Sequence, residues 1–76
     1  MKQYEVIVYS NIGDELIQIC YEGVETISYE SNNAIIKIAN AEMLTANIPL
    51  YRNLYLQGKN NAVIDSRIIV SIEVRG

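Results

Sequence analysis

Apolar and polar residues alternate most clearly near the C-terminal end of the sequence, between Ile64 and Arg75. Side chains of an extended chain point to opposite faces with a period of two. One face would carry Ile64, Ser66, Ile68, Val70, Ile72 and Val74, and the other Asp65, Arg67, Ile69, Ser71, Glu73 and Arg75. The pattern predicts one long strand with a buried apolar face and a mostly polar, solvent-exposed face. We expect it to be antiparallel, because parallel strands are usually apolar on both faces.

Shorter segments of alternating or β-branched residues predict further strands at about residues 3–10, 15–22, 24–30 and 34–39. The segments 11–14 and 31–33 between them contain Gly, Asp and Asn, which tolerate positive φ, and therefore predict tight turns. Gly23 interrupts the pattern between the second and third strands. An isolated glycine at such a place indicates a bulge or a sharp bend.

Residues 40–57 allow two interpretations. Asn40 could cap a short helix near 40–46. Equally, the apolar residues between 44 and 50 alternate as in a strand, with a break near Pro49 because proline has no amide proton to donate. The strand interpretation is favoured, with a further short strand at about 52–57 and a loop at 58–61.

Together these elements predict an all-β fold and a single domain over residues 1–76. Thirteen Ile and six Val fit this class, because branching at Cβ suits a pleated surface. Short strands at regular intervals suggest a small antiparallel meander that closes into a barrel or compact sandwich, of SH3-like or Sm-like size, with at most one short helix near 40–46.

The composition bears on compartment and partners. A single cysteine, Cys20, cannot form an internal disulfide, which indicates a reducing compartment. No apolar run approaches the roughly 20 residues that a membrane span needs, and no signal peptide is visible, so we expect a cytoplasmic protein. The net charge of −3 is uneven: six acids against Lys2 give −5 over residues 1–30, and five basic against three acidic residues give +2 over 31–76. Such asymmetry can serve a basic partner or self-association.

Catalytic and cofactor chemistry finds little support. Without histidine and with one cysteine, a single chain cannot build a structural zinc site, and the acids do not follow a calcium-loop spacing. No phosphate-binding glycine pattern is present. Ser66 should point away from Asp65 and Arg67, so neither activates it, and Cys20 has apolar and acidic neighbours typical of a packing residue. We therefore expect no enzyme, no metal and no cofactor.

The favoured functional hypothesis is a small protein-interaction module that self-associates as a homodimer or ring. Four apolar residues lie opposite faces already assigned to the core and form the predicted interface: Ile7, Tyr9, Ile35 and Ile69. Surplus apolar surface on a small protein usually marks an interface. The size, acidity and Asn- and Ile-rich composition also suit a phage or mobile-element accessory protein that binds a host protein.

The alternative is an Sm-like or SH3-like barrel that binds single-stranded nucleic acid. Its predicted contacts are Tyr51, Arg52, Tyr55 and Lys59, since such proteins stack bases on aromatic rings beside a positive groove. The acidic net charge argues against it, because nucleic-acid-binding domains are usually basic.

Overall fold

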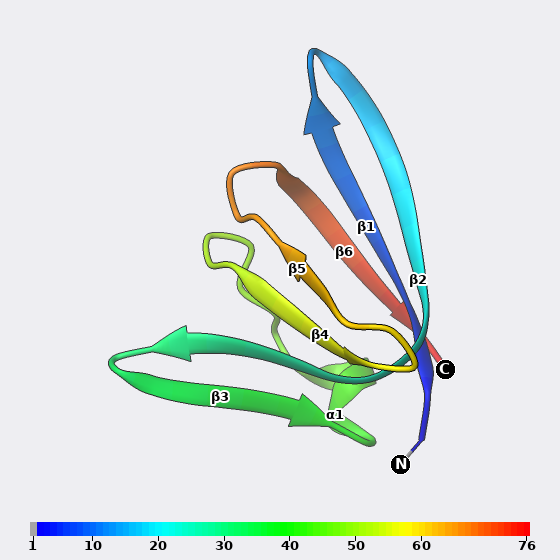
Figure 1. Ribbon diagram of the computed structural model, residues 1–76, viewed down its shortest axis with the longest axis vertical. Helices are drawn as coiled ribbons and strands as arrows, with labels where there is room; N and C mark the ends of the chain where they lie inside the picture. The colour runs from blue at the N-terminus through cyan, green and yellow to red at the C-terminus, as the bar shows by residue number, and fades with distance from the viewer. Residues whose placement is uncertain (1) are drawn as a thin grey trace.

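In the computed structural model, which describes residues 2–76, six strands form one antiparallel sheet (Figure 1). The elements, in chain order, are β1 (Tyr4–Ile12), β2 (Glu15–Ser31), β3 (Ala34–Ala39), α1 (Glu42–Thr45), β4 (Leu54–Gly58), β5 (Ala62–Ile64) and β6 (Ile69–Arg75). The strands follow the order β5-β4-β2-β1-β6, and β3 also pairs with β2. The predicted all-β, antiparallel class is confirmed.

The long strand β2 organises the sheet because it pairs with three other strands. Its first part pairs with β1 as far as Val24, and residues 26–31 pair with β3. Residues 24–28 also pair with β4. The change of partner occurs at Gly23, which has a φ of 68° and whose carbonyl accepts a hydrogen bond of 2.9 Å from the Lys59 amide. The strands predicted at 15–22 and 24–30 are thus one strand with an irregularity at the predicted glycine.

Both tight turns are confirmed, and they share one geometry. Gly13 and Asp14 have φ values of 56° and 66°, and Asn32 and Asn33 have values of 51° and 63°. Positive φ at both central residues is the signature of the two-residue turn that matches the twist of antiparallel strands. The turns set the strand registers, since Ile12 faces Glu15 and Ser31 faces Ala34.

The hydrophobic core lies on the inner face of the curved sheet. Alternate residues of β1 and β4 enter it, together with β2 residues and Met43 from α1. Its fully buried members are Val6, Val8, Val24, Ile27, Met43, Leu54 and Leu56. Ala46 and Ile48, from the segment after α1, pack against the same cluster. The face of β1 that carries Val6 and Val8 therefore packs in the core, and Ile7 lies on the opposite face.

The predicted closure into a barrel is wrong. β5 and β6 stand at the two ends of the strand order, each with one pairing partner among the described residues. The single long strand predicted over 64–75 is also wrong, because residues 66–68 form a turn between β5 and β6. The Ile68 amide donates to the Asp65 carbonyl (3.2 Å), and the Ser66 amide donates to Asn53 Oδ1 (2.9 Å). These bonds replace the ladder that a continuous strand would need.

Residues 40–57 follow the helical alternative at their start. α1 has four residues, and the strand predicted over 44–50 is absent from the described structure. Asn40 is not the helix cap: its φ is 55°, and its carbonyl accepts a hydrogen bond from the Met43 amide (3.0 Å). The short strand predicted near 52–57 is present as β4. No helix of residues 2–76 has the length and apolar character needed to cross a membrane.

Candidate interaction surface

The two hairpins that share β2 differ in how their outer strands are covered. β1 pairs with β2 on one edge and with β6 on the other. β3 pairs with β2 alone, and its other edge carries no strand among residues 2–76. Figure 1 shows the β2–β3 hairpin extending sideways from the rest of the sheet, with β3 on the outside. The main-chain groups on that edge are available for a further strand.

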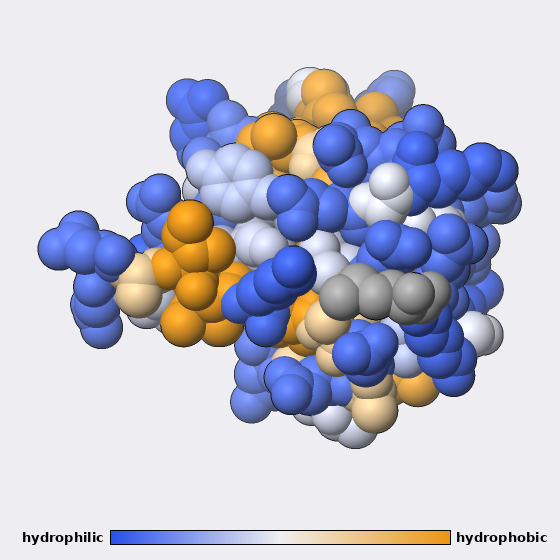
Figure 2. All heavy atoms as spheres, turned by 60° about the horizontal axis from the view of Figure 1, so that its bottom comes forward, coloured by the Kyte–Doolittle hydropathy of each residue, from blue (hydrophilic) through white to orange (hydrophobic). Residues whose placement is uncertain are grey.

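Apolar side chains remain exposed on both faces of this hairpin. Ile35 is 72% exposed and Ile36 is 39% exposed. They are adjacent in a strand and therefore point to opposite faces. Figure 2 shows hydrophobic atoms gathered on the projecting hairpin, just inside its polar tip. The sequence does not predict Ile36 as an interface residue, because Ile36 alternates with Ile35 and so lies on the same face of the strand as the buried Ile38. Its position three residues after the Asn32–Asn33 turn was the available signal, because a hairpin tip can extend beyond the core.

The four predicted interface residues differ in their exposure to solvent. Ile35 is exposed, as the prediction requires. Ile7 is wrong as a surface residue: it is 1% exposed, because β1 lies between two strands and Ile7 faces Cys20 on one side and Glu73 on the other. Ile69 packs against the core, because a register shift between Tyr9 and Ser10 sets Ser10 opposite Ile69. The sequence pattern had assigned Val70, not Ile69, to the core, and Val70 is exposed.

Tyr9, the fourth residue, is half-buried on the face of β1 that Ile7 shares. Its hydroxyl donates to Glu73 Oε2 at 3.5 Å, and Glu73 Oε1 also accepts a hydrogen bond from Arg75 Nε at 3.1 Å. The salt bridge with Glu73 raises the pKa of Arg75 above its usual value. Polar contacts therefore surround Tyr9 on the outer face of β1, where the sequence predicts an apolar interface.

Three of the four alternative nucleic-acid contacts lie together. Tyr51, Arg52 and Tyr55 line a polar cavity of about 250 Å³, which Glu30, Asn53 and Ser66 complete. Tyr51 is 76% exposed, and the Arg52 guanidinium lies 5.4 Å from the centre of its ring. Lys59 is not part of this group, because it follows the opposite end of β4, where its amide bonds to Gly23. The acidic side chain of Glu30 reduces the positive character of the cavity.

A second cavity, of about 360 Å³, lies on the outer face of the sheet where β3, β2 and β4 run side by side. Its lining includes Ile35 and Lys37 from β3, Ser28 and Glu30 from β2, and Tyr55 from β4. The strand register places Lys37 and Tyr55 on either side of Ser28, and Ile35 beside Glu30. The exposed isoleucine is therefore bordered by one acidic and one basic side chain.

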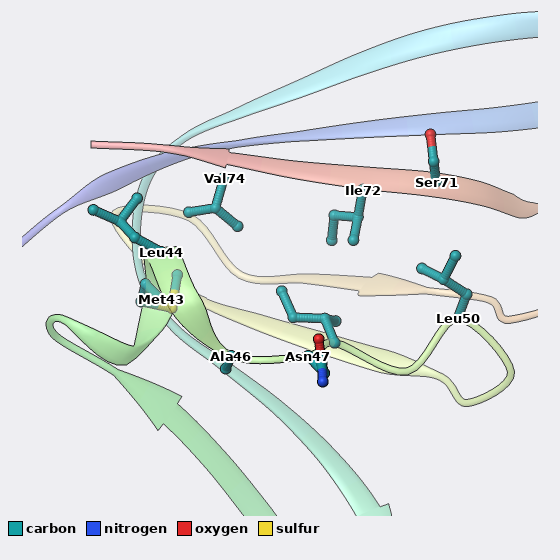
Figure 3. Close-up of a pocket in the computed structure, with 9 residues that line it drawn as sticks. Met43, Leu44, Ala46, Asn47, Leu50, Ser71, Ile72 and Val74 are labelled. Carbon is teal, nitrogen blue, oxygen red and sulfur yellow. The ribbon is translucent and has the colours of Figure 1, made fainter.

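A third cavity, of about 280 Å³, lies between β6 and the segment that contains α1. Figure 3 shows Ile72 and Val74 pointing from β6 toward Met43, Leu44 and the chain that follows α1. This segment lies along the inner side of β6, the strand at one end of the sheet. α1 also contacts β3, but in Figure 1 it lies at the C-terminal end of that strand, and the rest of the outer edge of β3 has no neighbouring segment.

Reactive groups in the described chain are few. Cys20 is exposed and accepts a contact from Gln18 Nε2 at 3.7 Å, so the prediction of a packing role is wrong. It alternates with Ile19 and Tyr21, which face the core residues Val8 and Val6 across the β1–β2 ladder. Between residues 2 and 76, no group of three or more acidic or cysteine side chains is placed to hold a metal ion. A hydrogen bond from Arg67 lowers the pKa of Asp65 to about 2, in the turn before β6.

Comparisons with known proteins add no relative from which a role could be transferred. No family model, curated protein sequence or solved structure matches this chain. The surface geometry is therefore the only guide to a role.

Proposed function

We propose that the chain is a small protein-interaction module that self-associates through its β2–β3 hairpin. The observation that carries the proposal is the exposure of Ile35 and Ile36 on opposite faces of a strand with a free edge. Burying an isoleucine side chain contributes roughly 1.5–3 kcal/mol. Two such residues beside free main-chain donors and acceptors give a partner both apolar area and hydrogen bonds.

The core of a single copy is complete without Ile35 and Ile36, so the fold does not explain why two isoleucines lie at these exposed positions. The core cluster lies at the other end of β3, where Ile38 is buried. A twofold homodimer is the commonest arrangement by which a small protein covers a self-complementary surface. A partner other than a second copy, such as the host protein expected for a mobile-element accessory protein, would compete for the same hairpin.

Light scattering tests the proposal with a matched pair of variants. Ile36→Glu places a charge on the hairpin, and Leu16→Glu places one on the tip of the β1–β2 hairpin, where Leu16 is 67% exposed. We expect a wild-type dimer or ring whose mass responds to protein concentration and hardly to salt. Ile36→Glu should raise the dissociation constant by roughly tenfold or more, equivalent to about 1.4 kcal/mol. Leu16→Glu should leave the mass unchanged.

Either of two results would contradict the proposal. One is a monomer at every concentration. The other is loss of assembly in Leu16→Glu with no change in Ile36→Glu. Circular dichroism of both variants must match that of the wild type, so that a change in mass reports assembly and not unfolding.

A second candidate function is the binding of single-stranded nucleic acid at the polar cavity of Tyr51, Arg52 and Tyr55. The exposed Tyr51 ring beside the Arg52 guanidinium favours it, because stacking on aromatic rings and contacts from arginine are how such proteins hold bases. Fluorescence anisotropy with a labelled 20-nucleotide strand at about 50 and 200 mM salt tests it, since such binding weakens steeply with salt. Arg52→Gln should abolish the binding. An anisotropy that does not rise at the lower salt concentration would rule this function out.

A further inference from the structure

We infer that β3 of one copy pairs antiparallel with β3 of a second copy, with the twofold axis at Ile36. The inference rests on the self-association proposed above and adds its register. Four strands have an edge without a strand partner among residues 2–76: β3, β5, β6 and the Glu15–Glu22 part of β2. β5 has only three residues, β6 runs beside the segment of α1, and this part of β2 contains acidic but no basic residues that could match a second copy. β3 has six residues and an open edge, which is the arrangement that invites a further strand.

The hairpin geometry fixes which main-chain groups of β3 are free. A two-residue turn closes on a hydrogen-bonded pair, here Ser31 and Ala34, and bonded and non-bonded pairs then alternate along the ladder. Ala34, Ile36 and Ile38 therefore direct their amides and carbonyls to β2. Ile35, Lys37 and Ala39 direct theirs to the open edge. A second strand on this edge must form its hydrogen bonds with those three residues.

Twofold symmetry leaves few registers. In an antiparallel pair, directly opposite residues carry their side chains on the same face. Each residue of β3 must therefore face a residue of the second copy that lies on the same face, an even number of positions away. The twofold axis then lies at one residue, which faces its own equivalent. An axis at Ile35 sets Lys37 opposite Asn33, which lies in the turn and not in the strand. Only one pair, Ile35 with Ile35 of the second copy, could then exchange regular ladder hydrogen bonds. An axis at Lys37 sets two like charges directly opposite, which is unfavourable. It also extends the pairing to Ala39, beside α1.

The axis at Ile36 avoids both problems. Ile35 of each copy then faces Lys37 of the other, and each of these two pairs exchanges two bonds, about four in all. Ile36 meets its own equivalent at a non-bonded position, where side chains approach most closely. Lys37 lies across Ile35 of the second copy, with Glu30 of that copy next in the row. Opposite charges thus flank the apolar contact on the outer face, and the two sheets become one.

Disulfide trapping reads this register directly. In a Cys20→Ser background, Ile36→Cys places two thiols at the axis, where the Cα atoms are about 4.5 Å apart and a disulfide can form. Ile35→Cys is the matched control, because its thiols are offset diagonally by about 7–8 Å, too far for a bridge. We expect a covalent dimer from Ile36→Cys under mild oxidation and little from Ile35→Cys. A dimer by light scattering that cross-links through Ile35→Cys instead would overturn the register and leave the proposed function standing. A monomer would overturn both.

A charge pair at position 35 gives a second readout without cross-linking. Ile35→Lys sets two lysines opposite in each of the two equivalent pairs, whereas Ile35→Glu sets an acid opposite Lys37. We expect Ile35→Lys to raise the dissociation constant roughly fivefold or more, and Ile35→Glu to bind more tightly than Ile35→Lys. Equal weakening by both variants would contradict the inferred register.

Discussion

The two hairpins of this small sheet begin from the same local chemistry and end in different environments. They share β2, and each is closed by two residues with positive φ. β1 is covered on its second edge by β6, and even Ile7 on its outer face is buried. β3 has no strand on its second edge among residues 2–76, and Ile35 is exposed. Pairing of the second edge, and not the sequence of the strand, distinguishes core from surface here.

The two strands also differ in how their main-chain groups are protected from pairing with other chains. A strand between two neighbours has both sets of main-chain groups bonded and both faces flanked by side chains. A strand at an edge keeps half of those groups free, and natural proteins usually protect such edges with charges, bulges or short strands. β3 carries one lysine for this purpose and otherwise reads Ala, Ile, Ile, Ile and Ala. The proposed pairing with a second copy would supply the protection that this edge lacks.

The largest predicted contrast is between Ile7→Ala and Ile35→Ala. Ile7 is buried, so truncation should cost about 2–5 kcal/mol through lost contacts and a residual cavity. Ile35 is exposed in the single chain, so its truncation should change the stability by about 0.5 kcal/mol or less. Urea denaturation at a protein concentration low enough to keep the chain monomeric measures both. Similar losses for the two variants would remove the distinction between the hairpins.

A smaller effect is expected at the glycine in the strand that both hairpins share. Gly23→Ala would force an alanine to φ near 68° and place its Cβ about 2.8 Å from Lys59 Cβ. The combined cost should be roughly 1–3 kcal/mol. Gly13→Ala is the matched control, since it has a similar φ but no atom within 4 Å of the added Cβ. It should cost less than Gly23→Ala in the same denaturation experiment, and the reverse order would show that the contact with Lys59 does not matter.

Ser10 tests whether every buried polar group of the first hairpin contributes to stability. Its hydroxyl oxygen is buried without a hydrogen-bond partner in the described structure. Removing an unsatisfied buried polar group is neutral or favourable, so Ser10→Ala should change stability by between zero and about +1 kcal/mol. A shift in the urea midpoint measures the difference. A clear loss of stability would mean that the hydroxyl has a partner, such as a buried water molecule.

The smallest effect concerns the turn between β5 and β6. Hydrogen bonds from Arg67 hold the pKa of Asp65 near 2 instead of 3.8. Because the folded-state pKa is the lower one, the turn is stabilised above pH 4, and this contribution is lost as the pH falls toward 2. Carboxyl chemical shifts followed by NMR should give a midpoint near 2, and Arg67→Gln should move it back toward 3.8. An unchanged midpoint in the variant would assign the shift to another cause.

Local sequence signals predicted local structure well and long-range structure poorly. The two turns, the bounds of β3 and the bend at Gly23 follow from residues whose backbone preferences act within a few positions. The break at 65–68 depends on Asn53, which is twelve residues before Asp65 and bonds to the Ser66 amide only in the folded chain. No alternation pattern contains that information.

Long-range pairing also explains why only some of the predicted interface residues are exposed. Ile7 and Ile35 have similar apolar surroundings in the sequence, and only the neighbouring strand decides that one is buried and the other exposed. Ile69 reached the core through a register shift that the period-two pattern cannot anticipate. Ile35 was predicted because it lies opposite a face assigned to the core, whereas Ile36 required knowledge of where the core ends.

Hydrogen exchange of the β3 amides tests the central claim most directly. The amides of Ile36 and Ile38 bond to β2 and should be protected in any state. Those of Ile35 and Lys37 face the open edge and should be protected only when a second copy is paired there. We predict slow exchange at Ile35 and Lys37 in the concentrated wild-type protein and fast exchange in Ile36→Glu. Fast exchange of these two amides in both proteins, with Ile36 protected in the wild type, would contradict an edge pairing through β3.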